Sequence, residues 1–189
     1  MLSPSKLIIF TKKARLYDVS IKFPDYNIRR ELLTEGVTEH KVKLFEGPLP
    51  TSLIIGLMSP DAFDGDFNKS SMKFDSHDID EVDLRLDNLS LVNFPMNMKS
   101  ENYLEFYLNY LKVTNRFENV NSTDALSYGN FKSNFMIHQN LAAENMTSGQ
   151  LIVRLKFKKL LVEKLYLVYM PIYEKTLSFD SHLNASVTN

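Results

Sequence analysis

The sequence predicts an all-β protein, a single jelly-roll β-sandwich of about eight strands with one inserted α-helix. Three observations support this prediction. Apolar and polar residues alternate with period two through most of the chain, one segment has helical spacing, and 44% of the 189 residues are hydrophobic. A chain of this size buries enough surface for one compact core. The jelly roll is the eight-stranded sandwich that accommodates long loops and an inserted helix.

We expect three parts along the chain: an N-terminal extension at 1–13, a jelly-roll domain at 14–180 and a loose C-terminal tail at 181–189. The apolar run at 7–10 is too short for the core of a signal peptide or for a membrane span. The chain has no cysteine, which fits a reducing compartment. We therefore expect a protein that is not secreted and has no membrane span.

The first half of the domain contains three predicted strands. "RLYDVSIKF" (15–23) alternates strictly, and we expect Pro24 and Asp25 to end it. "VTEHKVKLF" (37–45) alternates more weakly and precedes "EGPLP" (46–50), whose glycine and prolines favour a turn. "SLIIGLM" (52–58) is almost entirely apolar, which is typical of a strand covered on both faces.

An acidic stretch follows these strands. In "VDLRLDNLSL" (82–91), the residues Asp83, Arg85 and Asp87 alternate with apolar ones, so we expect them to face solvent. Upstream, "PDAFDGDFN" (60–68) combines Asp-Gly with other turn-forming residues and predicts a loop. The acidic stretch therefore reads as sheet and turn.

The same stretch contains a spacing that resembles a calcium loop. Asp64, Asp66 and Asn68 have the spacing of the first three ligands of an EF-hand, and Asp75 occupies its twelfth position. Lys69 stands where the EF-hand needs glycine, and the flanking sequences lack helical periodicity. We expect no calcium site and no cofactor.

One helix is predicted, "SENYLEFYLNYLKVTNRF" (100–117), which begins with a capping serine and has apolar residues at helical spacing. Its aromatic face is wider than one side of a sandwich needs, and we expect Phe106 and Tyr110 to point outward. Packing on the protein's own sheet or on a neighbouring subunit is favoured over a ligand-stacking surface. The candidate subunit interface consists of Tyr103, Phe106, Tyr107 and Tyr110.

The remaining chain predicts a long loop followed by the closing strands. The loop covers 120–134, and strands follow in "FMIHQNL" (135–141) and "TSGQLIVRLKF" (147–157). "KLYLVYMPIYEKTLSF" (164–179) is apolar on both faces until Pro171, which we expect to interrupt the strand ladder.

Charge and motifs exclude several function classes. The net charge of −1 gives no overall basic excess for sequence-independent DNA binding. The basic segment "RLKFKKLLVEK" (154–164) reads as a solvated strand face followed by a turn rather than as a nucleic-acid surface. The sequence contains no nucleophile elbow, phosphate loop, dinucleotide fingerprint or zinc-protease motif, and its four histidines are far apart. We expect no enzyme.

Two other function classes remain open at this point. One is a jelly-roll binding module, for carbohydrate, that uses exposed aromatic residues near Tyr103, Tyr107 and Tyr128. The other, more weakly indicated, is a metal-dependent enzyme of the cupin type, which normally needs a close pair of histidines.

The order of motifs resembles the major capsid proteins of Polinton/Maverick elements and related adintoviruses. The similarity begins with "LPTSLIIGLMSPDAFDGDFNKSSMKFDSHDIDEVDLRLDN", which has an apolar strand, an Asp-Ala-Phe turn, a Phe-x-x-His segment and an alternating strand in the family's order. "YLEFY" occupies the place of the family's tyrosine-rich helix, and "GQLIVRLKFKKLLVEKLYLVYMPIYEKTLSFD" is similar to its closing strands. The resemblance covers residues 14–180.

This resemblance implies a jelly roll similar to the C-terminal half of a double-jelly-roll capsid subunit, and hence a structural protein of a virion or virus-derived transposon. It implies assembly inside the cell, in nucleus or cytoplasm, and self-association into a trimeric or pseudo-hexameric capsomer. The implied partners are an N-terminal jelly-roll domain and a minor capsid or penton protein, with nucleic acid meeting at most the inner shell surface. The chain is shorter than the family's two tandem jelly rolls, so a fragment, a split gene and a host-domesticated remnant stay open.

Overall fold

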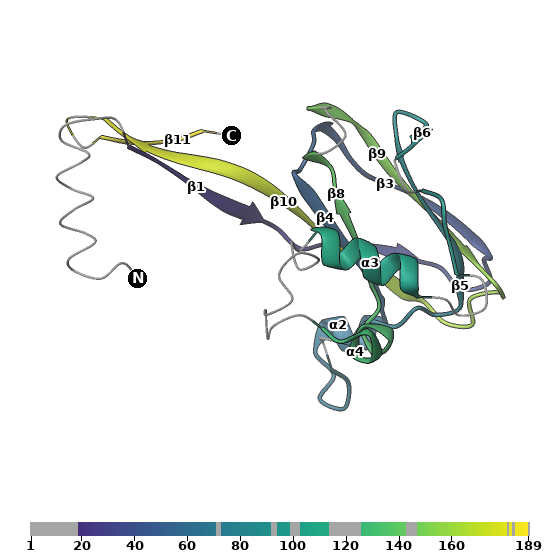
Figure 1. The fold of residues 1–189 in the computed structure, drawn as a ribbon. Helices are drawn as coiled ribbons and strands as arrows, with labels where there is room; N and C mark the ends of the chain where they lie inside the picture. Colours follow the sequence, from purple (N-terminus) through teal and green to yellow (C-terminus); the bar gives the residue numbers. More distant parts are fainter. Residues whose placement is uncertain are drawn as a thin grey trace. The chain divides into compact units, whose positions relative to one another are not determined.

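The computed structural model describes residues 19–70, 73–91, 94–98, 103–113, 126–142, 147–180, 182 and 184–188 (Figure 1). The chain forms two compact units. The larger runs from Asn27 to Pro171, and the smaller comprises Met1–Tyr26 and Ile172–Asn189. The predicted boundary after residue 13 lies outside the described residues, and the three-part division stays a prediction.

The larger unit is a sandwich of two antiparallel sheets (Figure 1). In the first sheet, β10 (Leu165–Phe179) lies between β2 (Arg29–Leu33) and β4 (Ser52–Met58), and β8 (Met136–Asn140) follows β4. The order in the second sheet is β3 (Glu39–Pro48), β9 (Ser148–Phe157), β5 (Ile79–Leu86) and β6 (Leu89–Ser90), with β7 (Met96–Asn97) also paired to β5.

Successive long strands alternate between the two sheets. The chain passes from β3 to β4, β5, β8, β9 and β10, changing sheet at every step, so hydrogen-bonded neighbours are not consecutive in sequence. These crossovers are typical of the jelly roll. The predicted fold class is therefore confirmed, although the described residues contain eleven labelled strands, because short pairings at β2, β6, β7 and β11 add to the longer ones.

The core lies between the sheets and follows the predicted alternation. Val42, Val153 and Leu84 stand opposite one another across β3, β9 and β5, and all three are buried. Fully burying such a side chain contributes about 1.5–3 kcal/mol. In β4, a Cβ added to Gly56 would collide with the ring of Phe74, which explains a glycine within an otherwise apolar strand.

Strand β3 departs from the prediction at its end. It continues through Gly47 and Pro48, which were expected to turn, and it contains an irregularity between Lys43 and Phe45. Gly47 has a φ of 105°, a conformation that glycine adopts without steric cost, and it keeps its pairing with Gly149.

Three helices lie among the described residues, where one was predicted. The predicted loop at 60–68 begins with the short helix α2 (Pro60–Asp64), so the loop prediction is wrong there. Ser59 caps this helix by accepting a hydrogen bond of 3.4 Å from the Ala62 N–H, and Gly65 ends it with a φ of 92°.

The predicted loop at 120–134 also contains a helix, α4 (Tyr128–Ser133). Ser127 caps it through a 3.2 Å hydrogen bond from the Asn130 N–H, and its Phe131 is fully buried. The third helix, α3 (Leu104–Val113), confirms the predicted helix over the part that is described.

The smaller unit is a three-stranded antiparallel sheet, in which Ile172–Phe179 of β10 pairs with β1 (Val19–Tyr26) and β11 (Ala185–Thr188). Pro24 was expected to end the first strand but lies within β1 opposite Glu174. It is tolerated because β1 is an edge strand and a proline nitrogen can face outward there. β11 lies within the segment 181–189, which was expected to be a loose tail, and pairs there with β10.

An interruption of the strand was predicted at Pro171, and β10 changes its partner strand there. Pairing between β10 and β2 reaches Tyr169, and pairing between β10 and β1 begins at Ile172, while β10 itself continues to Phe179. A proline cannot donate to a ladder, so it fits the position where one partner strand is replaced by another.

Candidate assembly surfaces

The aromatic residues of α3 form a cluster with α4 and β8. Phe106 packs edge-to-face on Phe135 with ring centroids 5.0 Å apart, and Tyr110 contacts Phe131 at 5.5 Å and His138 at 5.0 Å. Asn109 of α3 also donates a hydrogen bond to the backbone carbonyl of His138. These contacts fix the helix on the sheet.

The prediction that Phe106 and Tyr110 point outward is wrong. Their exposed fractions are 1% and 7%. The physical reason is that α4, which was predicted to be loop, supplies Phe131 beside Tyr110, while the residue before β8, Phe135, contacts Phe106. Leu104 of α3 is instead exposed, at 47%.

Tyr103, Tyr107 and Tyr128 do lie together. Tyr107 and Tyr128 make an edge contact at 5.3 Å, and the Lys132 ammonium lies 5.6 Å and 5.9 Å from the ring centroids of Tyr103 and Tyr128. The Tyr107 hydroxyl donates to the Leu126 carbonyl at 3.0 Å. Tyr103 and Tyr107 are half-buried and Tyr128 is exposed, so the three form a partly accessible aromatic surface. Their role in a subunit interface stays a prediction.

Beneath α3, His138 is a buried polar residue. Its exposed fraction is 4%, and its Nδ1 has no hydrogen-bond partner among the described residues. Burial lowers the pKa of His138 to about 4, and a hydrogen bond to the Met136 backbone offsets only part of that effect. The imidazole is therefore neutral in the fold near pH 7.

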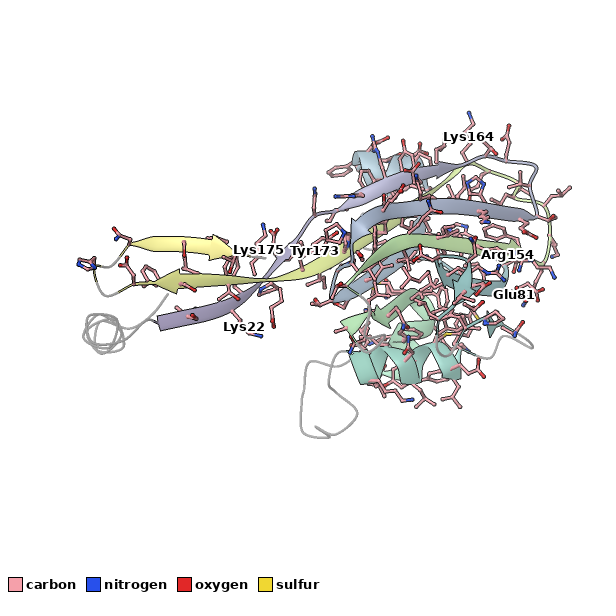
Figure 2. The ribbon with its side chains drawn as sticks, turned by 90° about the horizontal axis from the view of Figure 1, so that it is seen from above. Lys22, Glu81, Arg154, Lys164, Tyr173 and Lys175 are labelled. Carbon is pink, nitrogen blue, oxygen red and sulfur yellow. The ribbon has the colours of Figure 1, made fainter. Side chains whose placement is uncertain are left out.

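The outer face of the second sheet carries a network of ion pairs across three strands (Figure 2). Arg154 of β9 binds Glu39 of β3 through two nitrogens, at 2.8 and 3.2 Å, and Glu81 of β5 at 3.2 Å. The Arg154 hydrogen bonds lower the pKa of Glu39, and Glu39 in turn raises the pKa of Arg154. Bidentate arginine pairs of this kind fix geometry as well as charge.

Asp83 lies in the same face, and the prediction that it faces solvent is wrong. It is 1% exposed, whereas Asp87 is exposed as predicted. Arg85, two residues further along β5, folds back and pairs with Asp83 at 2.6 Å. The second carboxylate oxygen, Oδ1, has no partner among the described residues. Long side chains on the face thus cover a short acid that alternation alone would leave exposed.

The acidic residues around α2 are held by cations of the protein. Asp64 pairs with Arg30 at 2.6 Å, and Asp61 pairs with Lys69 at 2.8 Å, which raises the pKa of Lys69. Asp66 accepts a hydrogen bond from the Asn68 N–H at 2.8 Å, the local bond of a turn. Within the described ranges, no group of three His, Cys, Asp or Glu residues is arranged to hold a metal ion.

The remaining predicted features are separated. His77 lines two surface hollows, and its Nδ1 lies 4.0 Å from a carboxylate oxygen of Glu163. The basic segment 154–164 is confirmed as a strand face and turn, because β9 ends at Phe157 and the lysines that follow are exposed.

In the part of the chain that the structure describes, no helix is long and apolar enough to span a membrane.

Two solved structures share this fold. A chain of the Sputnik virophage, from a cryo-EM structure, matches with a TM-score of 0.53 at 12% identity, covering 89% of this chain and 39% of that chain. The mavirus major capsid protein matches with a TM-score of 0.51 at 8% identity, covering 91% of this chain and 41% of that chain. No protein-family model and no curated protein matches the sequence.

These matches concern the fold. They cover about nine tenths of this chain. This chain spans about two fifths of the length of each. This chain thus shares its fold with two viral chains.

Proposed function

We propose that this protein is a structural capsid protein that associates with copies of itself to form a shell. The observation that carries the proposal is the fold likeness over about nine tenths of the chain to a mavirus major capsid protein and a Sputnik virophage chain. The ordered series of motifs that resembles the Polinton and adintovirus capsid proteins supports the same conclusion independently of the coordinates.

The surfaces of the larger unit suit a building block. A shell subunit needs a stiff framework, and Arg154 ties three strands of one sheet together at their outer face. The helix α3 is anchored by buried Phe106 and Tyr110, which leaves Leu104 and the half-buried Tyr103 and Tyr107 for contact with a neighbouring subunit. Shell building of this kind needs geometry and surface rather than a catalytic group.

Within this proposal, the chain acts in the virion and derives from the Polinton/Maverick and adintovirus lineage. Its copies would form trimeric or pseudo-hexameric capsomers, completed by an N-terminal jelly-roll domain and a minor capsid or penton protein. Sequencing of the neighbouring reading frames tests the lineage. A packaging ATPase, a capsid protease or an upstream jelly roll is expected beside this gene, and a metabolic operon in their place would contradict the lineage.

The function itself is tested by producing the chain and following its association. Sedimentation velocity over a wide concentration range, combined with negative-stain electron microscopy, is expected to show oligomers and curved or closed sheets. A strict monomer at every concentration, also when an upstream jelly roll is supplied, would contradict the capsid proposal.

A second candidate, a carbohydrate-binding module, is favoured by one observation. The structure brings Tyr103, Tyr107 and Tyr128 together beneath Lys132, and aromatic faces of this kind stack on sugars. Glycan-array binding that is lost in Tyr128→Ala, with the fold intact by circular dichroism, would support this candidate. Absence of binding across the array would dismiss it.

A further inference from the structure

His138 lies on the outer face of the first sheet, beneath the helix α3. Residues directly opposite one another in an antiparallel ladder share a face, and His138 stands opposite Ile54 of β4. The neighbouring pair, Ile137 and Ile55, is buried in the core between the two sheets. Because side chains alternate along a strand, His138 points to the other side of the sheet, where α3 contacts β8 (Figure 1).

The groups around the imidazole are mostly apolar. Tyr110 is the titratable side chain that faces it from α3, with an edge contact at 5.0 Å, and β4 presents Ile54. The Lys132 ammonium of α4 lies instead over the rings of two other tyrosines. Burial lowers the pKa of His138 and a hydrogen bond with the Met136 backbone raises it, while no charged group among the described residues contributes.

Protonation would put a charge in a place that cannot solvate it. The Nδ1 atom of His138 has no partner among the described residues. Both ring nitrogens of a protonated imidazole carry a hydrogen, so Nδ1 would become a buried donor without an acceptor. Burying a charge or an unpaired donor is costly. A protonated ring therefore favours any rearrangement that brings it into water.

The helix α3 is the cover that can leave at the lowest cost. An opening on the inner side would separate the two sheets and their shared core. On the outer side, the helix is held by the packing of Phe106 and Tyr110 and by the hydrogen bond from Asn109 to the His138 carbonyl, rather than by a strand ladder. A helix of ten residues is marginal in water by itself, so α3 is expected to unwind when it leaves the sheet.

We propose that protonation of His138 releases α3 from the first sheet, which makes this helix an acid-sensitive cover. At neutral pH the uncharged ring fits beneath Tyr110 and the helix stays in place. Because α3 carries Tyr107 and the exposed Leu104, its release would also withdraw the surface that we propose for subunit contact. That consequence rests on the proposed function, whereas the release itself is a property of the single chain.

Hydrogen exchange of the backbone amides measures the release. When the helix is open, His138 lies in water with its ordinary pKa of 6.5, whereas its pKa is about 4 when the helix is closed. The open form therefore takes up a proton first, and the opening equilibrium is expected to rise about twentyfold from about pH 7 to about pH 5. The protection of the amides at 107–113 is expected to fall by the same factor, after correction for the intrinsic pH dependence of exchange.

Two variants and one strand serve as controls. His138→Phe keeps a ring beneath Tyr110 and cannot take up a proton, so the protection of α3 is expected to be equal at the two pH values. His40→Gln removes a half-buried histidine from β3, in the other sheet, and is expected to keep the twentyfold change. The amides of β9 report unfolding of the whole sandwich and are expected to be more protected than those of α3 at both pH values.

The wild type decides the proposal even if His138→Phe does not fold. Amides of α3 that are as protected as those of β9 would show that the helix leaves only when the whole sandwich unfolds. Protection of α3 that does not change with pH would show that its opening leaves His138 buried. A twentyfold change that persists in folded His138→Phe would belong to another group. Each of these three results would overturn the proposal.

The outcomes separate this inference from the proposed function. Acid-dependent opening of α3 in a chain that never assembles supports the release and contradicts the shell. Assembly of the chain at both pH values, with no change in the protection of α3, leaves the capsid proposal standing and overturns the release.

Discussion

Acidification is expected to destabilise this protein through His138. Burial lowers its pKa from 6.5 to about 4, so the unfolded chain takes up a proton at a higher pH than the folded chain does. The stability that depends on the neutral imidazole is present above the unfolded pKa of 6.5 and is lost as the pH falls below it. Each unit of pKa difference corresponds to about 1.4 kcal/mol. The expected loss from this residue is about 2 kcal/mol between pH 7 and pH 5, and about 3 kcal/mol below pH 4.

The assay is urea unfolding of the wild type, of His138→Phe and of His182→Gln at a series of pH values between about 7.5 and 4.5. Phenylalanine keeps an aromatic ring against Tyr110 and cannot take a proton, whereas His182 is exposed and serves as the control. His138→Phe is expected to lose about 2 kcal/mol less than the other two proteins on acidification to about pH 5. Parallel stability curves for all three proteins would show that His138 does not cause the loss of stability. Histidine NMR of the wild type gives the second measurement, and a His138 pKa near 6.5 would show the same.

Three further predictions concern packing and charge. Phe106→Ala is expected to lower the free energy of unfolding, measured in urea, by about 3–5 kcal/mol, and Leu104→Ala is expected to lower it by less than about 1 kcal/mol. Similar losses for the two variants would mean that Phe106 is not in the core. Arg85→Met is expected to lower the free energy of unfolding by several kcal/mol, because it leaves the buried Asp83 carboxylate without its cation. Adding Asp83→Asn to the same chain is expected to restore most of this loss. Additive effects of the two substitutions would contradict the pairing. Millimolar calcium is expected to leave the Tm unchanged, since the Asp64 carboxylate is already paired within the protein, and a rise of several degrees would show that the loop binds the ion.

Alternation was enough to predict the long strands and the fold class. The strands β4, β5 and β9 lie where period two or a continuous apolar run placed them, because burial between two sheets imposes those patterns on the sequence. The helix α3 follows from its 3.6-residue spacing for the same reason. A local pattern that has a single physical cause predicts its helix or strand without knowledge of the segments that pack against it.

The features that were missed depend on partners distant in sequence. Phe106 is buried only because Phe135 and the unforeseen helix α4 meet α3, and α4 itself has only a capping serine and one large apolar residue, Phe131, as local signals. Asp83 occupies a solvent-type position in the alternation and is covered by Arg85. In β11, pairing with β10 orders a polar segment whose composition favours coil. Each of these outcomes is decided by tertiary contacts.

The central claim, that this jelly roll builds a shell, is tested most directly by electron cryo-microscopy of the protein at high concentration. We expect repeating assemblies whose density accommodates the two-sheet sandwich of Asn27–Pro171 at every subunit, with tight lateral packing between copies. Dispersed single molecules with no repeating contact between them, under conditions in which the sandwich is folded, would contradict it.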